Sequence, residues 1–486
     1  MSSPPRPIAP LLAVWLLQLA AFFTPSATWS PMSRFALTRA VASGEGFSLG
    51  AWADATGDRA RVHDAWLSDK APFPALMGVV PYLLLDTAHR LTGREPPSFE
   101  AEARGETPAV RVELSPSAQQ LLYATSLGVS GASLVVLALH LYAMLRRRHD
   151  ARTALVATTL VCLGTPIYPY ATSFYGHVPA AALSLVALAA LDGPRASHRL
   201  ALAGACLAAA VGCEYLTIVP GSVIAAYAIA AGEPSERLSR LARLALGALP
   251  LVALLGAYHT VCFGAPWSTG YAHLANPTFV AGHARGVMGL GLPSPSAMAG
   301  LLVGTRRGLF YVAPISLLGV IGLFSPAPLA EAATPRWLGP DPVVRVGAFA
   351  LIALYLANAG YYMWWGGSAA GPRHLVPALP VLGFGLARLW QRPRARAPIA
   401  IVGALSIAIM LGVTAVGIEA PETGDVIFDF VLPRLSRGEI SSLPSATNLG
   451  LLLGLSPIAS LVPWLLWLIV LGTVLWRRTA AAESAS

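Results

Sequence analysis

A short charged motif offers the clearest chemistry in the sequence. Asp69 and Lys70 are neighbours, Pro72 follows at once, and Lys70 is the only lysine among 486 residues. An ammonium group can hold a phosphate through charge-assisted hydrogen bonds, and a carboxylate can act as a general base. The proline prevents a helix from continuing through the motif. The motif therefore predicts a charged site held at the membrane surface, just before the apolar run 75–85.

Further candidates for the same chemistry lie in other polar stretches. Asp58 is the second candidate base, beside Asp69, although most acids in such a segment are simply solvated. The remaining candidates for substrate binding are Arg34, Tyr175, His177, His273, Arg306, Arg307, Trp365, Arg373 and His374. Arg and His can hold a phosphate, and tryptophan can stack on a sugar. Structural roles stay open: Arg306 and Arg307 fit snorkelling anchors, and Trp365 fits an interfacial aromatic belt.

The composition places these residues in a membrane protein. Hydrophobic residues make up 55% of the chain and charged residues only 12%, whereas soluble domains carry about 25% charged residues. The net charge of +9 comes from arginines that flank apolar runs, so no nucleic-acid partner is expected. The four cysteines all lie in apolar runs without a Cys-x-x-Cys pair. They indicate buried thiols rather than a zinc site or a disulfide framework.

Apolar runs of near-spanning length predict an all-α bundle of about twelve transmembrane helices. The first run, 8–23, is interpreted as a retained helix, with a cleaved signal peptide as the alternative. The others are 117–145, 152–168, 178–192, 200–213, 215–231, 241–263, 309–324, 343–362, 374–389, 398–418 and 457–476. Arginine-rich loops then fall on one side, at 146–152, 193–199, 232–243, 388–397 and 477–478. That side is predicted to be cytoplasmic.

The opposite side receives the stretches rich in Asp, His, Tyr and Trp. These are the long loops 24–116, 264–308 and 419–456, and the short loops 168–177 and 363–374. The apolar stretch 74–91 is broken by Pro81 and ends in charged residues. Counting it as a span would reverse every later loop. It is therefore predicted to lie in the membrane interface.

Two sequence stretches carry a resemblance to a known family. The run 34–44 (RFALTRAVASG), followed by Asp69-Lys70-Ala71-Pro72, resembles the first outer loop of the GT-C glycosyltransferases, in particular the lipid A aminoarabinose transferases. That loop typically reads Asp-Glu-x-Arg-Tyr-Ala, then a small-residue helix ending in Gly, then Glu-Lys-Pro-Pro. The segment 364–377 is similar to a Trp-Trp-Gly-Gly…Gly-Pro-Arg-Tyr stretch of related proteins. The resemblance covers the topology of roughly the first 265 residues.

The resemblance implies a polyprenyl-phosphate-linked sugar donor, a non-cytoplasmic active site and inverting transfer. It assigns the donor phosphate to Lys70 and aligns Asp69 with the acid of the family motif. Two departures matter: the family's catalytic Asp and the Glu beside it fall at Pro31 and Met32, and His177 stands roughly where a second acid is expected. The base must then come from elsewhere, with Asp58 and Asp69 as the first candidates. No cofactor is assigned, and participation of a divalent metal stays open.

The sequence thus predicts a multi-pass glycosyltransferase of the bacterial inner membrane. It would move a sugar from a polyprenyl-phosphate carrier to an envelope glycan, lipid or protein acceptor at the periplasmic face. Residues 1–265 would form the GT-C-like module with loop 24–116, and residues 266–486 the C-terminal helices with loops 264–308 and 419–456. Two alternatives remain: a transporter or flippase for a lipid-linked sugar, with Glu214 as its clearest intramembrane charge, and a catalytically altered pseudoenzyme.

Overall fold

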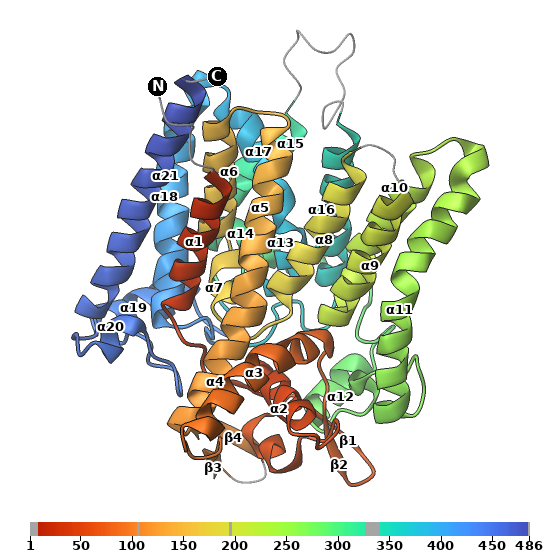
Figure 1. Ribbon diagram of the computed structural model, residues 1–486, viewed down its shortest axis with the longest axis vertical. Coiled ribbons are helices and arrows are strands. Elements are labelled where there is room, and N and C mark those ends of the chain that lie inside the picture. Colours follow the sequence, from red (N-terminus) through yellow and green to blue (C-terminus); the bar gives the residue numbers. More distant parts are fainter. Residues whose placement is uncertain (1–7, 105–106, 194–196, 326–340, 485–486) are drawn as a thin grey trace.

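The protein is a bundle of helices with a layer of short helices and hairpins at one end (Figure 1). The computed structural model describes residues 8–104, 107–193, 197–325 and 341–484. Within these residues, five helical segments are long and apolar enough to cross a membrane: Pro116–Arg146, Pro234–Phe263, Pro342–Gly360, Pro393–Val416 and Ala459–Ala481. Shorter apolar helices accompany them: α1 (Ile8–Ala21), α6 (Ala151–Gly164), α8 (His177–Leu191), α9 (Ser197–Cys213), α10 (Ile218–Ala230) and α15 (Ile315–Phe324).

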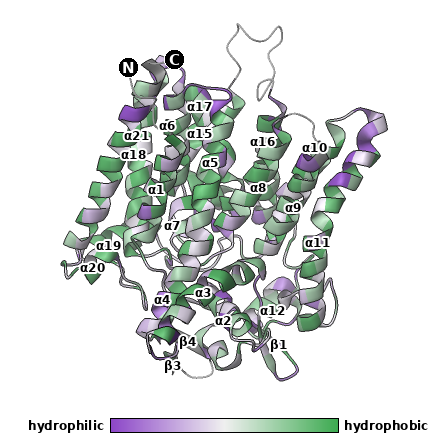
Figure 2. Ribbon diagram, viewed as in Figure 1, coloured by the Kyte–Doolittle hydropathy of each residue, from purple (hydrophilic) through white to green (hydrophobic). Residues whose placement is uncertain are grey.

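Packing of these helices builds one large apolar core. The long segments contain α4 (Pro116–Ser126), the π-helical turn η2 (Leu127–Gly131), α5 (Ala132–Arg146), η4 (Pro234–Glu236), α11 (Arg237–Phe263), α16 (Pro342–Gly360), α18 (Pro393–Val416), η8 (Ala459–Leu461) and α21 (Val462–Ser484). Helix α5 packs against α1, α6 and α8, and α9 packs against α8 and α11. Figure 2 shows hydrophobic residues along the middle of the bundle and hydrophilic residues gathered toward its ends. This distribution fits helices that cross a bilayer.

Prolines interrupt two of the predicted spans. The run 309–324 divides at Pro314 into α14 (Leu309–Val312) and α15. The run 374–389 begins as the 3₁₀ segment η6 (Arg373–Val381), which contains Pro377 and Pro380, and continues as α17 (Leu382–Trp390). Proline lacks an N–H and clashes with the preceding turn, so a regular α-helix cannot form there. The chain around Arg373 is consequently a tight irregular turn at the edge of the core.

The segment 24–116 forms most of the end layer. It contains α2 (Trp29–Ala42), η1 (Gly50–Ala55), β1 (Arg59–Val62), β2 (Ala65–Ser68), α3 (Phe73–Leu91), β3 (Phe99–Arg104) and β4 (Thr107–Leu114). Strands β1 and β2 pair antiparallel, as do β3 and β4, so the prediction of an all-α protein was wrong for these two hairpins. The β1–β2 loop consists of His63 and Asp64, with His63 at φ 53°. This pair lacks the Asn-Gly signature of such turns.

The end layer and the arginine-rich loops lie at opposite ends of the bundle. Helix α3 packs against α2 and α4 beneath the bundle in Figure 1, and it is not among the candidate spans found in the described residues. Both termini and the α10–α11 connection lie at the other end. There, Arg148 forms ion pairs with Asp192 and Asp341. This separation matches the sidedness predicted from the arginine asymmetry.

Short segments complete the end layer. They are α7 (Ile167–Ala171), η3 (Tyr215–Thr217), η5 (Gly270–Ala272), α12 (Pro277–His283), α13 (Pro295–Val303), η7 (Val426–Val431), α19 (Leu432–Ser436) and α20 (Leu449–Leu452). Leu274 forms an isolated β-bridge with Ala60, and Asn448 forms one with Phe23. Loops from the middle and the end of the sequence are therefore tied to the first outer segment.

Candidate functional site

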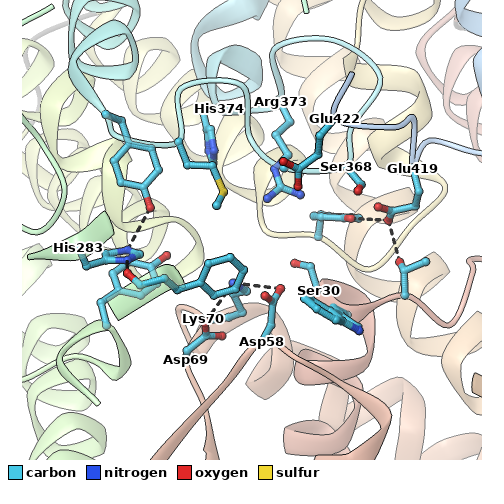
Figure 3. Close-up of a pocket in the computed structure, with 18 of the residues that line it drawn as sticks. Ser30, Asp58, Asp69, Lys70, His283, Ser368, Arg373, His374, Glu419 and Glu422 are labelled. Carbon is cyan, nitrogen blue, oxygen red and sulfur yellow. Dashed lines mark hydrogen bonds and ion pairs between the residues drawn. The ribbon is translucent and has the colours of Figure 1, made fainter. Parts of the chain in front are cut away.

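A cavity of about 400 Å³ lies where the end layer meets the bundle (Figure 3). Its wall draws on segments from the first outer loop to the last. The lining residues are Ala27, Thr28, Trp29, Ser30, Asp58, Asp69, Lys70, Tyr175, Tyr271, Phe279, His283, Tyr361, Tyr362, Met363, Gly367, Ser368, Arg373, His374, Glu419 and Glu422. Of the predicted site residues, Asp58, Asp69, Lys70, Tyr175, Arg373 and His374 line this cavity. Its charged and aromatic wall suits a polar, anionic ligand.

The β1–β2 hairpin explains how Lys70 meets two carboxylates. Its register pairs Arg59 with Ser68, so Asp58, just before β1, lies beside Asp69, just after β2. Lys70 Nζ is 3.0 Å from Asp58 Oδ2 and 3.3 Å from Asp69 Oδ2. The two acids and the lysine form one cluster, called here the Lys70 cluster. Its formal charge is negative when both acids are ionised.

Asp69 is the most deeply buried member of the Lys70 cluster, with 1% of its surface exposed. Its Oδ1 has no hydrogen-bond partner among the described residues. The start of η5 covers it closely, since a Cβ on Gly270 would lie 2.6 Å from the Asp69 Cα. The pKa of Asp69 is raised to about 6, mainly by burial and to a smaller extent by Asp58, although Lys70 and Arg34 act in the opposite direction. Burial dominates because it disfavours the charged carboxylate.

Asp69→Asn is expected to stabilise the protein more at pH 7.5 than at pH 4.5. The folded pKa of Asp69, about 6, exceeds its ordinary value of 3.8. Between those values the folded state retains a proton that the unfolded state has lost, so wild-type stability falls as pH rises. The asparagine cannot ionise, and the expected gain above pH 6 is on the order of 1–3 kcal/mol. Thermal unfolding of both proteins across pH measures it, and equal unfolding temperatures at every pH would contradict it.

Arg373 is the cation of the cavity that has no acidic partner. Its guanidinium donates no hydrogen bond to any described residue, and its buried Nε is unpaired. It lies 5.6 Å from the centre of the Tyr175 ring. The preceding loop turns through Gly366, whose φ is +74° and whose Cβ, if present, would lie 3.1 Å from the Arg373 Nε. Because a cation in a cavity is costly without a partner, Arg373 indicates a binding position for an anion.

Arg34 and His177 were predicted to bind substrate, but neither lines the cavity. Arg34 donates to Ser30 and forms an ion pair with Glu214 at 3.0 Å, and His177 Nδ1 lies 3.4 Å from the same carboxylate. A Cβ on Gly176 would lie 2.1 Å from the Cys213 carbonyl oxygen, so the chain passes very close here. Glu214 thus joins α2, α8 and the α9–α10 junction. Arg34 and His177 therefore lie behind the cavity wall, and their predicted role in substrate binding stays a prediction.

The His177 ring nevertheless supports the cavity wall. It stacks on Tyr175, with ring centres 5.6 Å apart, and meets His374 edge-on at 5.6 Å. The guanidinium of Arg373 lies over the ring of Tyr175, and Tyr175 also lines the cavity. Arg373 and His374 therefore share the cavity with residues of the first outer loop, and His177 lies one layer behind the cavity surface.

Arg307 also lies behind the wall rather than in it. It is 1% exposed, and its guanidinium donates to the backbone carbonyls of Trp365, Gly367 and Pro421. It therefore joins the loop before Arg373 to the loop after α18. A buried guanidinium with several carbonyl partners favours a structural role, and the predicted substrate contact of Arg307 stays a prediction.

Three further predicted residues lie next to the cavity without lining it. Arg306 donates to the Glu422 carbonyl and lies 5.3 Å from the centre of the Trp365 ring. Trp365 Nε1 donates to Glu422 Oε2 at 3.0 Å. His273 bonds Ser268 and stacks on Phe263. All three were predicted from residue type alone, and their side chains are engaged by protein neighbours.

Sequence reasoning missed two acids in the cavity wall, Glu419 and Glu422. Glu419 follows the end of α18, and its Oε1 accepts hydrogen bonds from the Tyr175 hydroxyl at 2.6 Å and from Thr28 Oγ1 at 2.7 Å. Burial raises the pKa of the Glu419 carboxyl. The sequence feature that could have identified Glu419 is its position, directly after the predicted span 398–418. Nothing in the sequence linked it to Thr28 or Tyr175.

The last feature of the site is the capacity of its side chains to hold a metal ion. In the described part of the chain, no group of three or more His, Cys, Asp or Glu side chains is arranged to hold a metal ion. The side chains facing the cavity instead offer two cations, four acids and several aromatic rings. These groups can bind an anion, exchange a proton and stack against a ring.

Comparison with known proteins relates this arrangement to solved structures. No protein-family model matches the sequence, and no curated protein matches it. The structure of ArnT from Cupriavidus metallidurans bound to undecaprenyl phosphate is similar, with a TM-score of 0.52 and 15% identity. The alignment covers 97% of this chain and 76% of that chain. The apo structure of the same protein gives a TM-score of 0.51. The predicted resemblance to GT-C lipid A aminoarabinose transferases is confirmed at the level of the fold.

Proposed function

We propose that this protein transfers a sugar from a polyprenyl-phosphate carrier to a hydroxyl of an envelope glycan, lipid or protein. The observation that carries the proposal is the unpaired Arg373 guanidinium, which shares one cavity with Lys70. A lipid phosphate presents its charge at headgroup depth, which is where the end layer meets the bundle. The fold likeness to ArnT, whose structure holds undecaprenyl phosphate, supports the same ligand class.

Arg373 and Lys70 would hold the donor phosphate from two directions. A guanidinium offers a planar fork of donors to phosphate oxygens, whereas an ammonium acts as a point charge. The bound anion would also attract Lys70 away from its two carboxylates. Asp58 and Asp69 would then be free to accept a proton, as the sequence predicted for them. They would also keep Lys70 oriented toward the cavity before the donor arrives.

The transfer requires one proton movement and one bond exchange. A carboxylate takes the proton of the acceptor hydroxyl as its oxygen forms a bond to the anomeric carbon of the donor sugar. The bond from that carbon to the phosphate oxygen breaks, and its electron pair stays on the phosphate. Lys70 and Arg373 stabilise the charge that develops there. The products are the glycosylated acceptor and the polyprenyl phosphate, and attack opposite the leaving group inverts the anomeric carbon.

The site would face the periplasm in a bacterial inner membrane. We place about twelve helix crossings around it, with loops 24–116, 264–308 and 419–456 on the non-cytoplasmic side. The arginine-rich loops would be cytoplasmic. A donor delivered to the outer leaflet could then enter the cavity with its isoprenoid chain still in the bilayer.

Reconstituted vesicles test the proposed function directly. Protein in liposomes with undecaprenyl-phosphate-linked sugars and an envelope-lipid extract should release undecaprenyl phosphate and label the acceptor. Empty liposomes are the control. Movement of intact donor between leaflets, with no cleavage of the sugar–phosphate bond, would support the flippase alternative and overturn ours. Glu214, the charge on which that alternative relied, is held by Arg34 and His177.

A further inference from the structure

The first turn of α2 contains no acidic residue. The GT-C outer loop that this sequence resembles carries two acids where this chain has Pro31 and Met32. Neither side chain can accept a proton. The structure brings a carboxylate to this corner from a distant part of the chain, because Thr28, the N-cap residue of α2, donates to Glu419 Oε1 at 2.7 Å. Glu419 lies 391 positions later in the sequence.

The hydrogen bonds of Glu419 leave one of its oxygens free. Oε1 accepts both available hydroxyl donors, from Tyr175 and Thr28. Oε2 accepts no hydrogen bond from any described residue, and Glu419 lines the cavity. Two donors on one oxygen fix the orientation of the carboxylate. The second oxygen is left facing the position of a ligand, which is the arrangement a general base needs.

Asp58 and Asp69 are less suited to the same task in their observed positions. Both lie within 3.3 Å of the Lys70 ammonium, so each must leave this ion pair before it can accept a proton from an acceptor hydroxyl. Glu419 forms no ion pair with a described lysine, arginine or histidine. Glu422, the other acid missed in the wall, is exposed, and its Oε2 accepts from Trp365. Glu419 is thus the half-buried acid of the cavity that is both oriented and unpaired.

The placement of Glu419 also fits the geometry of displacement. Figure 3 shows Glu419 and the Lys70 cluster separated across the cavity, with Ser30 between them at the wall. A phosphate held at Lys70 and a hydroxyl held at Glu419 would approach the sugar from different sides. An inverting displacement needs the entering and leaving oxygens on opposite sides of the anomeric carbon.

We propose that Glu419 is the general base of the transfer, a catalytic role that rests on the function proposed above. Its Oε2 takes the proton from the acceptor hydroxyl while that oxygen attacks the anomeric carbon and the phosphate leaves with the bonding electron pair. The proton then passes to solvent, which restores the carboxylate. Thr28 and Tyr175 are positioning residues that orient Glu419. A carboxylate from the last outer loop thereby replaces the acids absent from α2.

Glu419→Gln separates this role from a structural one. The amide keeps a carbonyl oxygen for Thr28 and Tyr175 but cannot accept a proton, so kcat should fall about 10²- to 10³-fold. The KM for the donor, undecaprenyl phosphate binding and the unfolding temperature should remain near wild type. Glu439→Gln is the matched control, because Glu439 lies in the same outer loop and forms ion pairs with Arg434 and Arg437 outside the cavity.

Two further readouts identify proton transfer. The wild-type kcat should rise with pH through the pKa of Glu419, which burial and Asp58 raise and which Arg373, Tyr175 and Thr28 lower. Glu419→Gln should lose that rise. In Glu419→Ala, added formate should restore part of the transfer by serving as an external base, which restored folding alone cannot explain.

The outcomes distinguish this proposal from the function on which it rests. If the wild-type protein transfers sugar and Glu419→Gln retains at least a third of its kcat, Glu419 is not the base, and the proposed function stands. A large loss of kcat that is accompanied by equal unfolding or weaker donor binding assigns Glu419 a structural role and also overturns the proposal. If wild-type protein transfers no sugar from any polyprenyl-phosphate donor, both proposals fail.

Discussion

Arg373→Gln should lower the transfer rate by about 10²- to 10³-fold, the usual effect of removing one preorganised donor from a developing anion. The guanidinium lines the cavity, carries no acidic partner and leaves its Nε unpaired. It therefore needs no rearrangement before it meets a phosphate. Glutamine retains a polar side chain but loses the charge and the fork of donors. Binding of undecaprenyl phosphate should weaken together with the loss of turnover.

The unfolding temperature of Arg373→Gln separates an effect on the site from an effect on folding. Arg373 forms no hydrogen bond or ion pair with a described residue, so replacing it with a neutral side chain breaks no such contact. Arg373→Gln should therefore unfold at the same temperature as wild type, while it loses turnover. Arg434→Gln is the control, since Arg434 pairs with Glu439 outside the cavity wall. Normal turnover in Arg373→Gln would remove the observation on which the proposed function depends.

The parts of the site that could be predicted from the sequence are local ones. Asp69 and Lys70 are adjacent, and their charge, the nearby proline and the apolar run behind them are visible without a structure. The arginine asymmetry separated the two ends of the bundle, because the positive-inside rule depends on composition rather than on packing. Asp58 joined the cluster through the β1–β2 register. That hairpin could not be foreseen because its His-Asp turn carries no strong signal.

The sequence did not separate the residues that line the cavity from those that lie behind its wall, and the reason is physical. Arginine, histidine and tryptophan have the same chemistry whether they face a cavity or a backbone carbonyl, and only burial and partners decide between the two. Arg307 donates to backbone carbonyls of two distant loops, and Arg34 binds Glu214, 180 positions away. Glu419 was missed for the same reason, since its two hydroxyl donors lie 391 and 244 positions earlier. Contacts at such separations are set by tertiary packing alone.

The cavity wall draws on both sides of the predicted division of the chain at residue 265. Segments before and after residue 265 both contribute to its wall: Lys70 comes from the first outer loop, and Arg373 and Glu419 come from later ones. Arg307 ties two of the later loops together by backbone hydrogen bonds. We therefore expect the two segments to act as one unit, so neither should bind the donor without the other.

Lys70→Met should lower kcat/KM about ten- to a hundred-fold, because the loss of a charge-assisted hydrogen bond costs on the order of 1.5–3 kcal/mol. Methionine keeps an unbranched stem and removes the charge. It also leaves Asp58 and Asp69 facing one another with no cation between them. Their repulsion, which raises the pKa of one of the pair, should lower the unfolding temperature and repel the donor phosphate.

Two further variants separate these effects of Lys70. Lys70→Arg keeps the charge but changes the donor geometry, so partial activity is expected. Lys70→Met combined with Asp69→Asn removes one of the facing acids and should recover the unfolding temperature without recovering transfer. If Lys70 only balances the two acids, the double variant should instead transfer sugar at the wild-type rate. Turnover per folded molecule, measured beside thermal unfolding, decides whether the lysine binds the donor or merely holds the hairpin.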